Sequence, residues 1–448
     1  MDKTPLEQWI ASKVSRCSDA QNLSRKDLEH YQLNRLRNII RYVQDRSPFY
    51  RKHLARFSLA RLQHLEYFQT LPFTTVEDLR TKGPEFLCVS QNEIKRVVTL
   101  PDSDPMVKPR RVYFTADEID LTLDFFYHGM MSIVRPGQKV LVLMPGERPD
   151  TVGDLLVRAL SRIDVQGTVH GLVQDPGFTI QEILRIRPDA LVAIPVQALS
   201  IVRHEDSSLI PKGLIKNVLL SSDYVSPAIV EELGRVLKCG VFNHYGTTEM
   251  GFGGGVECSA LHGYHLREAD LFIEIVDPVS GLPQPDGIYG EVVFSTLTRR
   301  GMPLLRYRTG DISRFLTDPC PCGTVLRRLD TIMGRLTDFV RLGQSHWLCI
   351  SDLDDILFSV PGVLNFSAVL TNDREKDLLE IKIKVGNTEG RSILETVFSV
   401  LTHAHVISEA ITDGSLSLKS VTFDKENLVN PSAVKRAIQD KRKTARLR

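Results

Sequence analysis

The chain has 448 residues, of which 42% are hydrophobic and 25% are charged, and its formal net charge is +1. This length accommodates about three average domains, or one large domain and one small one. Because the net charge is close to zero, we expect neither nucleic acid nor a membrane surface to attract the protein as a whole.

The N-terminus and the cysteines indicate a cytoplasmic protein. The sequence begins Met-Asp-Lys-Thr-Pro-Leu-Glu, which lacks the apolar run of a signal peptide. No uninterrupted apolar stretch approaches the ~20 residues that cross a bilayer. Seven cysteines, an odd number in a long chain, argue against a disulfide framework.

The first recognisable element is an amphipathic helix. Ser24 and Asp27 have the spacing of a capping box at a helix start. Apolar residues then recur at intervals of three and four, at Leu33, Leu36, Ile40 and Val43. The pattern ends at Ser47, because the residue before a proline disfavours the helical conformation. We expect a packing layer here and assign it no chemistry.

Strands and helices alternate in the middle of the chain. We expect strands at residues 111–115, 139–144, 190–194 and 218–220, and helices at residues 117–131 and 152–163. Such alternation is typical of an α/β fold with a mainly parallel sheet covered by helices on both faces. Ser222 and Asp223 follow the last of these strands, at the end of a sheet where α/β proteins commonly bind ligands.

Residues 242–258 combine groups that suit a nucleotide. Tyr245 and Gly246 are followed by Thr247, Thr248 and Glu249, and then by four glycines within five residues. Hydroxyls donate hydrogen bonds to phosphate oxygens, a carboxylate is a hard ligand for Mg²⁺, and glycines let the backbone approach a ligand closely. The stretch predicts a nucleotide-phosphate and metal site, and the alternative is a glycine-rich hairpin.

The last third of the chain changes in pattern. Strands are expected at residues 271–276 and 291–295, with a turn rich in proline and glycine at 278–290. Beyond residue 339 we expect strands at 364–370, 378–385 and 416–423, and helices at 392–401 and 431–441. This predicts a compact α+β module of about a hundred residues.

Cysteine and histidine spacing predicts a metal centre. The relevant residues are Cys258, His262, His265, Cys320 and Cys322. Three thiols and one imidazole form a common structural zinc set, and either histidine could complete it. The alternative is a group of buried free cysteines beside surface histidines.

Three segments together resemble the core motifs of the adenylate-forming superfamily. They are Tyr245-Gly-Thr-Thr-Glu249, Tyr307-Arg-Thr-Gly-Asp311 and Gly334-Arg-Leu-Thr-Asp338. Within that superfamily the chain looks most like the phenylacetate-CoA ligase branch. The supporting segments are Ser47-Pro-Phe-Tyr50, Leu71-Pro-Phe-Thr-Thr75 and Glu257-Cys258.

The resemblance implies an enzyme that activates a carboxylic acid with ATP through an acyl-adenylate, then transfers the acyl group to a thiol. An aryl acid and coenzyme A are the expected substrates, with Mg²⁺ and a structural zinc, and a homodimer is one assembly that the protein could form. It also implies a large domain at residues 1–335, a hinge at 336–338 and a small domain at 339–448. His265 becomes the expected zinc ligand, because relatives in this branch carry a similar Gly-x-His.

The resemblance also implies roles for individual residues. Tyr245 would stack on adenine and Asp311 would bind the ribose hydroxyls. Thr248 would bind the α-phosphate and Glu249 would hold Mg²⁺. The remaining expected contacts to nucleotide, phosphate or hinge come from Lys108, Ser222, Asp223, Gly246, Thr247, Arg335, Asp338 and Lys435. Phe126, Tyr127 and His128, in the expected helix 117–131, are acyl-pocket candidates, and core packing is their alternative.

Two segments depart from the family pattern. The phosphate loop lacks both of its glycines and carries Asp102 and Asp104, whose charges oppose a polyanion, although Lys108, Arg110 and Arg111 add compensating charge. At the C-terminus Ala433 aligns with the family's lysine, and Lys435 is the nearest substitute. The alternative function is therefore a catalytically impaired protein that binds a nucleotide or an acyl-adenylate. A third class is a basic surface at residues 435–448 for an acidic partner.

Overall fold

The computed structural model of the protein describes residues 3–15, 23–101, 106–373, 376–386, 391–424 and 436–442. The chain forms two compact units, which we call unit 1 and unit 2. Unit 1 comprises Met1–Gln138, Gly146–Gly167 and Phe242–Ile332, and unit 2 comprises Lys139–Pro145, Thr168–Val241 and Met333–Arg448. The division into residues 1–335, 336–338 and 339–448 stays a prediction.

Unit 1 begins with helices, several of which are capped by side chains. Its N-terminal helices are α1 (Pro5–Ser15), α2 (Arg25–Arg46), α3 (Pro48–His53), α4 (Leu65–Phe68) and α5 (Val76–Lys82). Ser24 and Asp27 form the expected capping box of α2, with both reciprocal hydrogen bonds present. Ser47 ends α2 and its side chain caps α3, which has Pro48 in its first turn. The predicted helix and its boundaries are confirmed.

A strand pair and two helices of unit 1 lead towards the expected site. Strands β1 (Ile94–Leu100) and β2 (Arg110–Thr115) pair antiparallel. Thr115 then caps α6 (Ala116–Met130) through a capping box with Glu118. Helix α6 packs against α7 (Val152–Ser161), and this packing helps to cover the apolar faces of the two helices.

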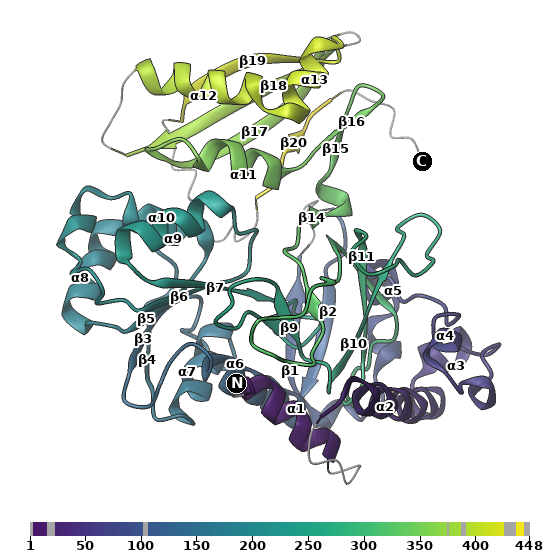
Figure 1. The fold of residues 1–448 in the computed structure, drawn as a ribbon. Coiled ribbons are helices and arrows are strands. Elements are labelled where there is room, and N and C mark those ends of the chain that lie inside the picture. Colours follow the sequence, from purple (N-terminus) through teal and green to yellow (C-terminus); the bar gives the residue numbers. More distant parts are fainter. Residues whose placement is uncertain are drawn as a thin grey trace. The chain divides into compact units, whose positions relative to one another are not determined.

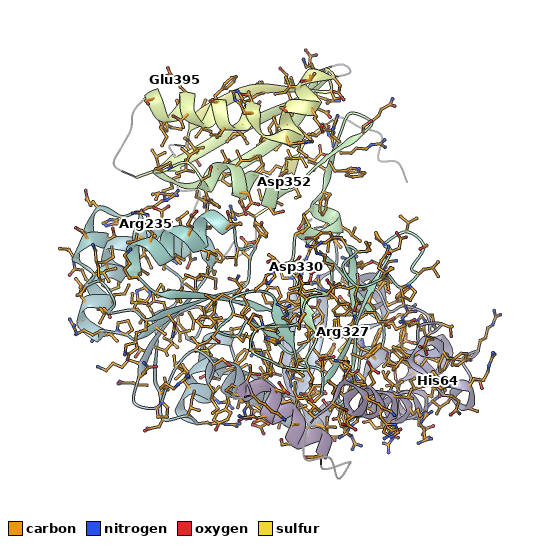
Figure 2. All side chains as sticks on the ribbon, in the orientation of Figure 1. His64, Arg235, Arg327, Asp330, Asp352 and Glu395 are labelled. Atoms are coloured by element: carbon orange, nitrogen blue, oxygen red, sulfur yellow. The ribbon has the colours of Figure 1, made fainter. Side chains whose placement is uncertain are left out.

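The remainder of unit 1 is rich in strands. Strands β10 (Leu271–Val276), β11 (Gly290–Thr296) and β12 (Tyr307–Ser313) form an antiparallel sheet. The end of β7 (Gly240–Tyr245) pairs antiparallel with β8 (Gly255–Val256), which pairs with β9 (Tyr264–Leu266), and β9 pairs with β13 (Arg328–Leu329). Side chains fill the interior of the unit, and Arg327 and Asp330, which flank β13, are labelled in Figure 2.

Unit 2 contains the predicted parallel sheet. Strands β3 (Lys139–Leu143), β5 (Ala190–Ala193) and β6 (Asn217–Leu220) pair in parallel, and every residue of β5 is buried. Helices α8 (Pro176–Ile186), α9 (Pro195–Val202) and α10 (Pro227–Leu237) accompany these strands, and α9 and α10 lie side by side (Figure 1). Continuous apolar strands of this kind are typical of a parallel sheet covered by helices.

The C-terminal part of unit 2 is the expected α+β module. Its sheet has the order β19-β18-β17-β20. The elements are β15 (Val340–Leu342), β16 (His346–Leu348), α11 (Ile350–Phe358), β17 (Val363–Asp373), β18 (Lys376–Val385), α12 (Arg391–His403), α13 (His405–Thr412), β19 (Leu416–Phe423) and β20 (Gln439–Asp440). Helices α12 and α13 lie along β19 (Figure 1).

One predicted element of this module is wrong. A helix was expected at residues 431–441, of which residues 436–441 are described. The described part contains β20, whose residues pair in parallel with Val369 and Leu370 of β17. Backbone hydrogen bonding to the edge of an existing sheet therefore overrides the helical pattern of the local sequence.

The basic C-terminal segment is partly neutralised inside unit 2. Arg436 forms a two-pronged ion pair with Asp354, with hydrogen bonds of 2.6 and 2.7 Å. Arg442 pairs with Asp440 and Asp377. These two arginines are thus engaged within the protein, which reduces the charge that they could offer to an acidic partner.

Within residues 3–15, 23–101, 106–373, 376–386, 391–424 and 436–442, no helix combines the length and apolar character that a membrane crossing requires.

Candidate active site

The expected nucleotide segment is a tightly packed loop at the end of β7. Gly254 N donates to Tyr245 O at 2.9 Å and closes the loop between β7 and β8. A Cβ added at Gly246 would lie 2.7 Å from Phe252 O, and one at Gly253 would lie 2.1 Å from the Phe125 ring. The glycines are therefore required by close packing of the loop on itself and on α6. The hairpin geometry is present, and phosphate binding by this loop stays a prediction.

A hydrogen bond joins two of the three motifs. The Tyr245 hydroxyl donates to Asp311 Oδ2 at 2.9 Å, although the residues are 66 positions apart in sequence. Both side chains are buried. Tyr245 comes from the end of β7 and Asp311 from β12, so the sheet that contains β7 and the sheet that contains β12 meet at this contact.

Glu249 is buried in a set of donors that the sequence did not reveal. Arg110 Nε donates to Glu249 Oε1 at 2.8 Å, and the Tyr307 hydroxyl donates to the same oxygen at 3.2 Å. The Arg110 and Glu249 side chains are only 14% and 5% exposed. The expected metal ligand is thus held by a cation from β2 and a phenol from the start of β12.

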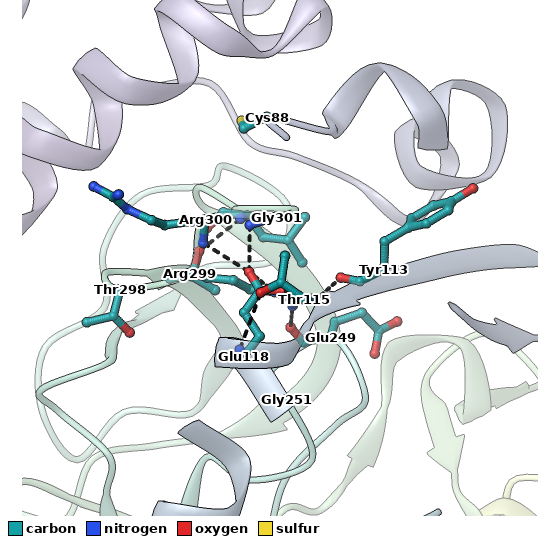
Figure 3. A network of polar contacts seen from close by, with 12 residues as sticks. Cys88, Tyr113, Thr115, Glu118, Glu249, Gly251, Thr298, Arg299, Arg300 and Gly301 are labelled. Carbon is teal, nitrogen blue, oxygen red and sulfur yellow. Dashed lines mark hydrogen bonds and ion pairs between the residues drawn. The ribbon is translucent and has the colours of Figure 1, made fainter. Parts of the chain in front are cut away.

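A second arginine fixes the backbone of the same residue (Figure 3). Arg299 Nη1 donates to Glu249 O at 2.9 Å, and Arg299 Nη2 donates to Tyr113 O at 2.8 Å. Glu118 holds the loop that carries this arginine, because its Oε1 accepts from the backbone N of Arg300 and Gly301 at 2.9 and 2.7 Å. Sequence reasoning missed these residues. Only Glu118 carried a signal in the sequence, which is its capping-box spacing from Thr115.

The other expected nucleotide contacts are distributed over both units. In unit 1, Thr247 and Thr248 are half-buried and Lys108 is exposed. In unit 2, Ser222 has a left-handed backbone with φ of 80°, and Asp223 lies 3.4 Å from Arg436. Arg335 ends β14 (Gly334–Arg335), and Asp338 lies in the short helix Leu336–Asp338 that follows. Convergence of the unit 2 residues with Tyr245 and Asp311 stays a prediction.

One expected site residue, Lys435, lies outside the described part of the chain, and its role stays a prediction. Asp102 and Asp104, the carboxylates that depart from the family's phosphate loop, also lie outside it.

The three candidate acyl-pocket residues point to different neighbours in unit 1. Phe126 lies 6.3 Å from the His244 ring, directly before Tyr245 in sequence. His128 instead stacks on Trp9 of α1 at 5.1 Å, and Tyr127 packs edge-on against His128. Burial, together with the nearby Lys13, lowers the pKa of His128 to about 4. The acyl-pocket role of these three residues stays a prediction.

The expected metal ligands gather in unit 1. Ligand atoms of Cys258, His265, Cys320 and Cys322 all lie within 4.8 Å of one another. The Cys258 and Cys320 sulfurs are 3.7 Å apart, and His265 Nε2 lies 3.4 Å from Cys320 Sγ. A zinc ion with Zn–S bonds of about 2.3 Å in a tetrahedron sets two sulfurs about 3.8 Å apart. The four donors therefore fit a tetrahedral zinc ion.

His265, rather than His262, joins this group. The His262 carbonyl accepts a hydrogen bond from Arg328 at 2.9 Å instead. Burial, together with the charge of Arg328, lowers the pKa of His265 to about 4, so its imidazole is neutral at neutral pH. Burial raises the pKa of the Cys322 thiol to about 12, so metal binding there must displace thiol protons.

No protein-family model matches the chain, but curated proteins do. The chain is 28% identical over 396 residues to the phenylacetate-coenzyme A ligase of Thermus thermophilus, covering 85% of this chain and 86% of that protein. It is 29% identical over 326 residues to the phenylacetate-coenzyme A ligase of Pseudomonas putida, covering 70% and 72%.

Solved structures share the fold. A 2-hydroxyisobutyryl-CoA ligase in the postadenylation state, in complex with R3-HIB-AMP, matches with a TM-score of 0.78 and 19% identity, covering 94% of this chain and 91% of that one. An anthranilate CoA ligase in complex with anthranoyl-AMP matches with a TM-score of 0.53 and 14% identity, covering 73% and 63%. The predicted α/β fold with an additional α+β module is confirmed.

Proposed function

We propose that this chain, a member of the adenylate-forming superfamily in its phenylacetate-CoA ligase branch, activates a carboxylic acid with ATP and transfers the acyl group to coenzyme A. In the first step a carboxylate oxygen attacks the α-phosphorus of ATP, and pyrophosphate leaves. In the second step the thiolate of coenzyme A attacks the acyl carbon, and AMP leaves.

The observation that carries this proposal is the buried hydrogen bond between Tyr245 and Asp311. This bond places an aromatic ring beside a carboxylate. The ring can stack on an adenine base, and the carboxylate can accept hydrogen bonds from the two ribose hydroxyls. Glu249 follows Tyr245 by four residues and also lies buried. We thus assign stacking to Tyr245, ribose binding to Asp311 and metal binding to Glu249, all in unit 1.

The roles of the remaining residues rest on their motifs. Thr248 and Thr247 donate hydroxyls to phosphate, and Lys108 adds positive charge. From unit 2, Ser222 and Asp223 edge the adenine. Arg335 reaches ribose or phosphate, Asp338 serves as the pivot of the small domain, and Lys435 neutralises charge during adenylation.

Mg²⁺ is the expected metal at Glu249, whose carboxylate is a hard oxygen ligand. When bound, the ion would neutralise phosphate charge during the attack on ATP. The chain's own contribution is the rigid placement of Glu249 by Arg299, which holds its carbonyl at 2.9 Å.

We infer that the acid is an aryl acid. Three aromatic rings support this substrate class, since Phe125 and Phe126 lie 5.9 and 6.3 Å from the ring of His244. Burial lowers the pKa of His244 to about 4, so this ring is neutral at neutral pH. A flat, uncharged ring of the acid would match such an aromatic and apolar environment.

An acid panel tests the proposed reaction. Purified protein with ATP, Mg²⁺ and coenzyme A should release pyrophosphate in proportion to added phenylacetate or a related aryl acid, and more slowly with aliphatic acids of similar size. The measurement is an enzyme-coupled pyrophosphate assay, with omission of acid as its control. Stabilisation by AMP without pyrophosphate release from any acid would instead favour an adenylate-binding protein without ligase activity.

We also infer that the cluster of Cys258, His265, Cys320 and Cys322 holds a structural zinc ion. Cys320 and Cys322 follow β12 closely in sequence, whereas Cys258 follows β8 and His265 lies within β9. An ion bound to all four would cross-link these segments of unit 1. That role resembles a disulfide in effect, because it closes loops between distant positions.

Replacement of Cys320 by serine should remove zinc and lower the thermal stability of the protein. Serine cannot supply the thiolate that the tetrahedral set requires, and loss of the ion would remove the cross-link between these segments. Metal content by mass spectrometry and the melting temperature measure the two effects. Cys239→Ser is the control, since Cys239 is a half-buried free cysteine outside the cluster and donates to the Leu233 carbonyl at 3.8 Å. Full zinc occupancy in Cys320→Ser would contradict the assignment.

We also propose that the protein is cytoplasmic and forms a homodimer. Fractionation of cells and analytical ultracentrifugation of the purified protein test them separately.

A further inference from the structure

Arg110 occupies the place beside the Glu249 carboxylate that a metal ion bound to Glu249 would need. Its Nε lies 2.8 Å from Glu249 Oε1. Mg²⁺ binds carboxylate oxygens at about 2.0–2.1 Å and needs their lone pairs and their negative charge. A guanidinium at hydrogen-bond distance from the same oxygen supplies the neutralising charge itself. A dication and this guanidinium repel each other, so they are alternative partners of Glu249 Oε1.

The surroundings of Arg110 make this competition strong. The Arg110 and Glu249 side chains are both largely buried, so water screens their attraction poorly. Tyr307 donates to the same oxygen at 3.2 Å, which further satisfies it. Arg299 donates to the Glu249 backbone carbonyl at 2.9 Å, so the loop that carries the carboxylate is also tied down.

Arg110 also lies where the negative charge of a nucleotide is expected. It begins β2, immediately after the segment that replaces a glycine-rich phosphate loop. A guanidinium is planar and binds phosphate oxygens with two parallel hydrogen bonds. A triphosphate could therefore draw Arg110 away from Glu249, and this would open the carboxylate to the metal.

We propose that Arg110 is an exchange residue that couples metal binding to nucleotide binding. Without nucleotide it pairs with Glu249 and keeps metal affinity low. With nucleotide it moves to the phosphates, and Mg²⁺ takes its place on the carboxylate. Because coupling is reciprocal, the metal in turn strengthens nucleotide binding by releasing Arg110. The inference rests on the proposed function for the identity of the ligands.

A titration with Mn²⁺ in the absence of nucleotide tests this directly. Electron paramagnetic resonance measures free Mn²⁺, and no turnover is needed. Arg110→Gln should bind Mn²⁺ about tenfold more tightly than the unmodified protein, the factor that corresponds to losing one charged hydrogen bond of about 1.5 kcal/mol. The double variant Arg110→Gln with Glu249→Gln should lose this gain, which locates the metal on Glu249.

Arg111→Gln is the matched control. Arg111 is the next residue, is exposed, and loses the same charge on substitution. It should leave Mn²⁺ affinity unchanged. Equal Mn²⁺ affinity in Arg110→Gln and the unmodified protein, or an equal gain in Arg111→Gln, would overturn the proposal.

Arg110→Lys keeps the test decisive if Arg110→Gln does not fold. Lysine retains the charge but has no Nε at the position that now contacts Glu249, so its Mn²⁺ affinity should be intermediate. An affinity equal to that of the unmodified protein would then contradict the proposal. If no acid supports pyrophosphate release but Arg110→Gln still binds Mn²⁺ more tightly, only the proposed ligase function fails.

Discussion

Replacement of Glu249 by glutamine should lower the rate of acid-dependent pyrophosphate release by about 100-fold or more, because charge stabilisation by a bound metal is a large part of phosphoryl and adenylyl chemistry. Glutamine keeps the size of the side chain but removes the charge that binds Mg²⁺. It also leaves the Arg110 guanidinium buried without its carboxylate. The assay is pyrophosphate release at saturating ATP and acid.

Glu274→Gln controls for the loss of a buried ion pair. Glu274 pairs with Arg306 at 3.1 Å, and both side chains are nearly inaccessible to solvent. This variant should lose thermal stability, as Glu249→Gln does, while its folded fraction retains the unmodified activity. Retention of more than about a tenth of the activity by Glu249→Gln would contradict the role assigned to Glu249.

Replacement of Asp311 by alanine should weaken AMP binding by about 10- to 100-fold, as expected from losing two hydrogen bonds from the ribose hydroxyls to a carboxylate. The substitution also removes the acceptor of the Tyr245 hydroxyl, which lies 2.9 Å away. Isothermal titration with AMP measures the effect.

Tyr245→Phe separates the two contributions. Phenylalanine keeps the ring that would stack on adenine but cannot donate to Asp311. We expect its AMP affinity to fall by less than about tenfold, because the lost hydrogen bond joins two protein side chains and none of the bonds to AMP is removed. Unchanged AMP affinity in Asp311→Ala would show that the ribose does not bind at this carboxylate.

Much of the fold could be predicted because its periodic patterns are local. The strands at residues 190–194 and 218–220 are continuous apolar runs, and both became buried neighbours in a parallel sheet. The Ser24 and Asp27 capping box follows from adjacent sequence and is present. The helix expected at residues 431–441 failed, since pairing of β20 with β17 depends on a strand more than 60 residues earlier.

The candidate site could be predicted only where rare residue types mark it. The metal cluster could be predicted because thiols and imidazoles with such spacing have few other uses. The structure brings together its four members, Cys258, His265, Cys320 and Cys322. The contact of Arg110 with Glu249 joins residues 139 positions apart. Arginine and glutamate are common at surfaces, so nothing in the sequence distinguished this buried pair from an ordinary solvated charge.

The most direct measurement of the central claim is a crystal structure of the protein with bound AMP. The adenine should lie against the Tyr245 ring, and both ribose hydroxyls should donate to Asp311. AMP bound elsewhere, with Tyr245 and Asp311 still hydrogen-bonded to each other and touching no part of it, would contradict the assignment of this site.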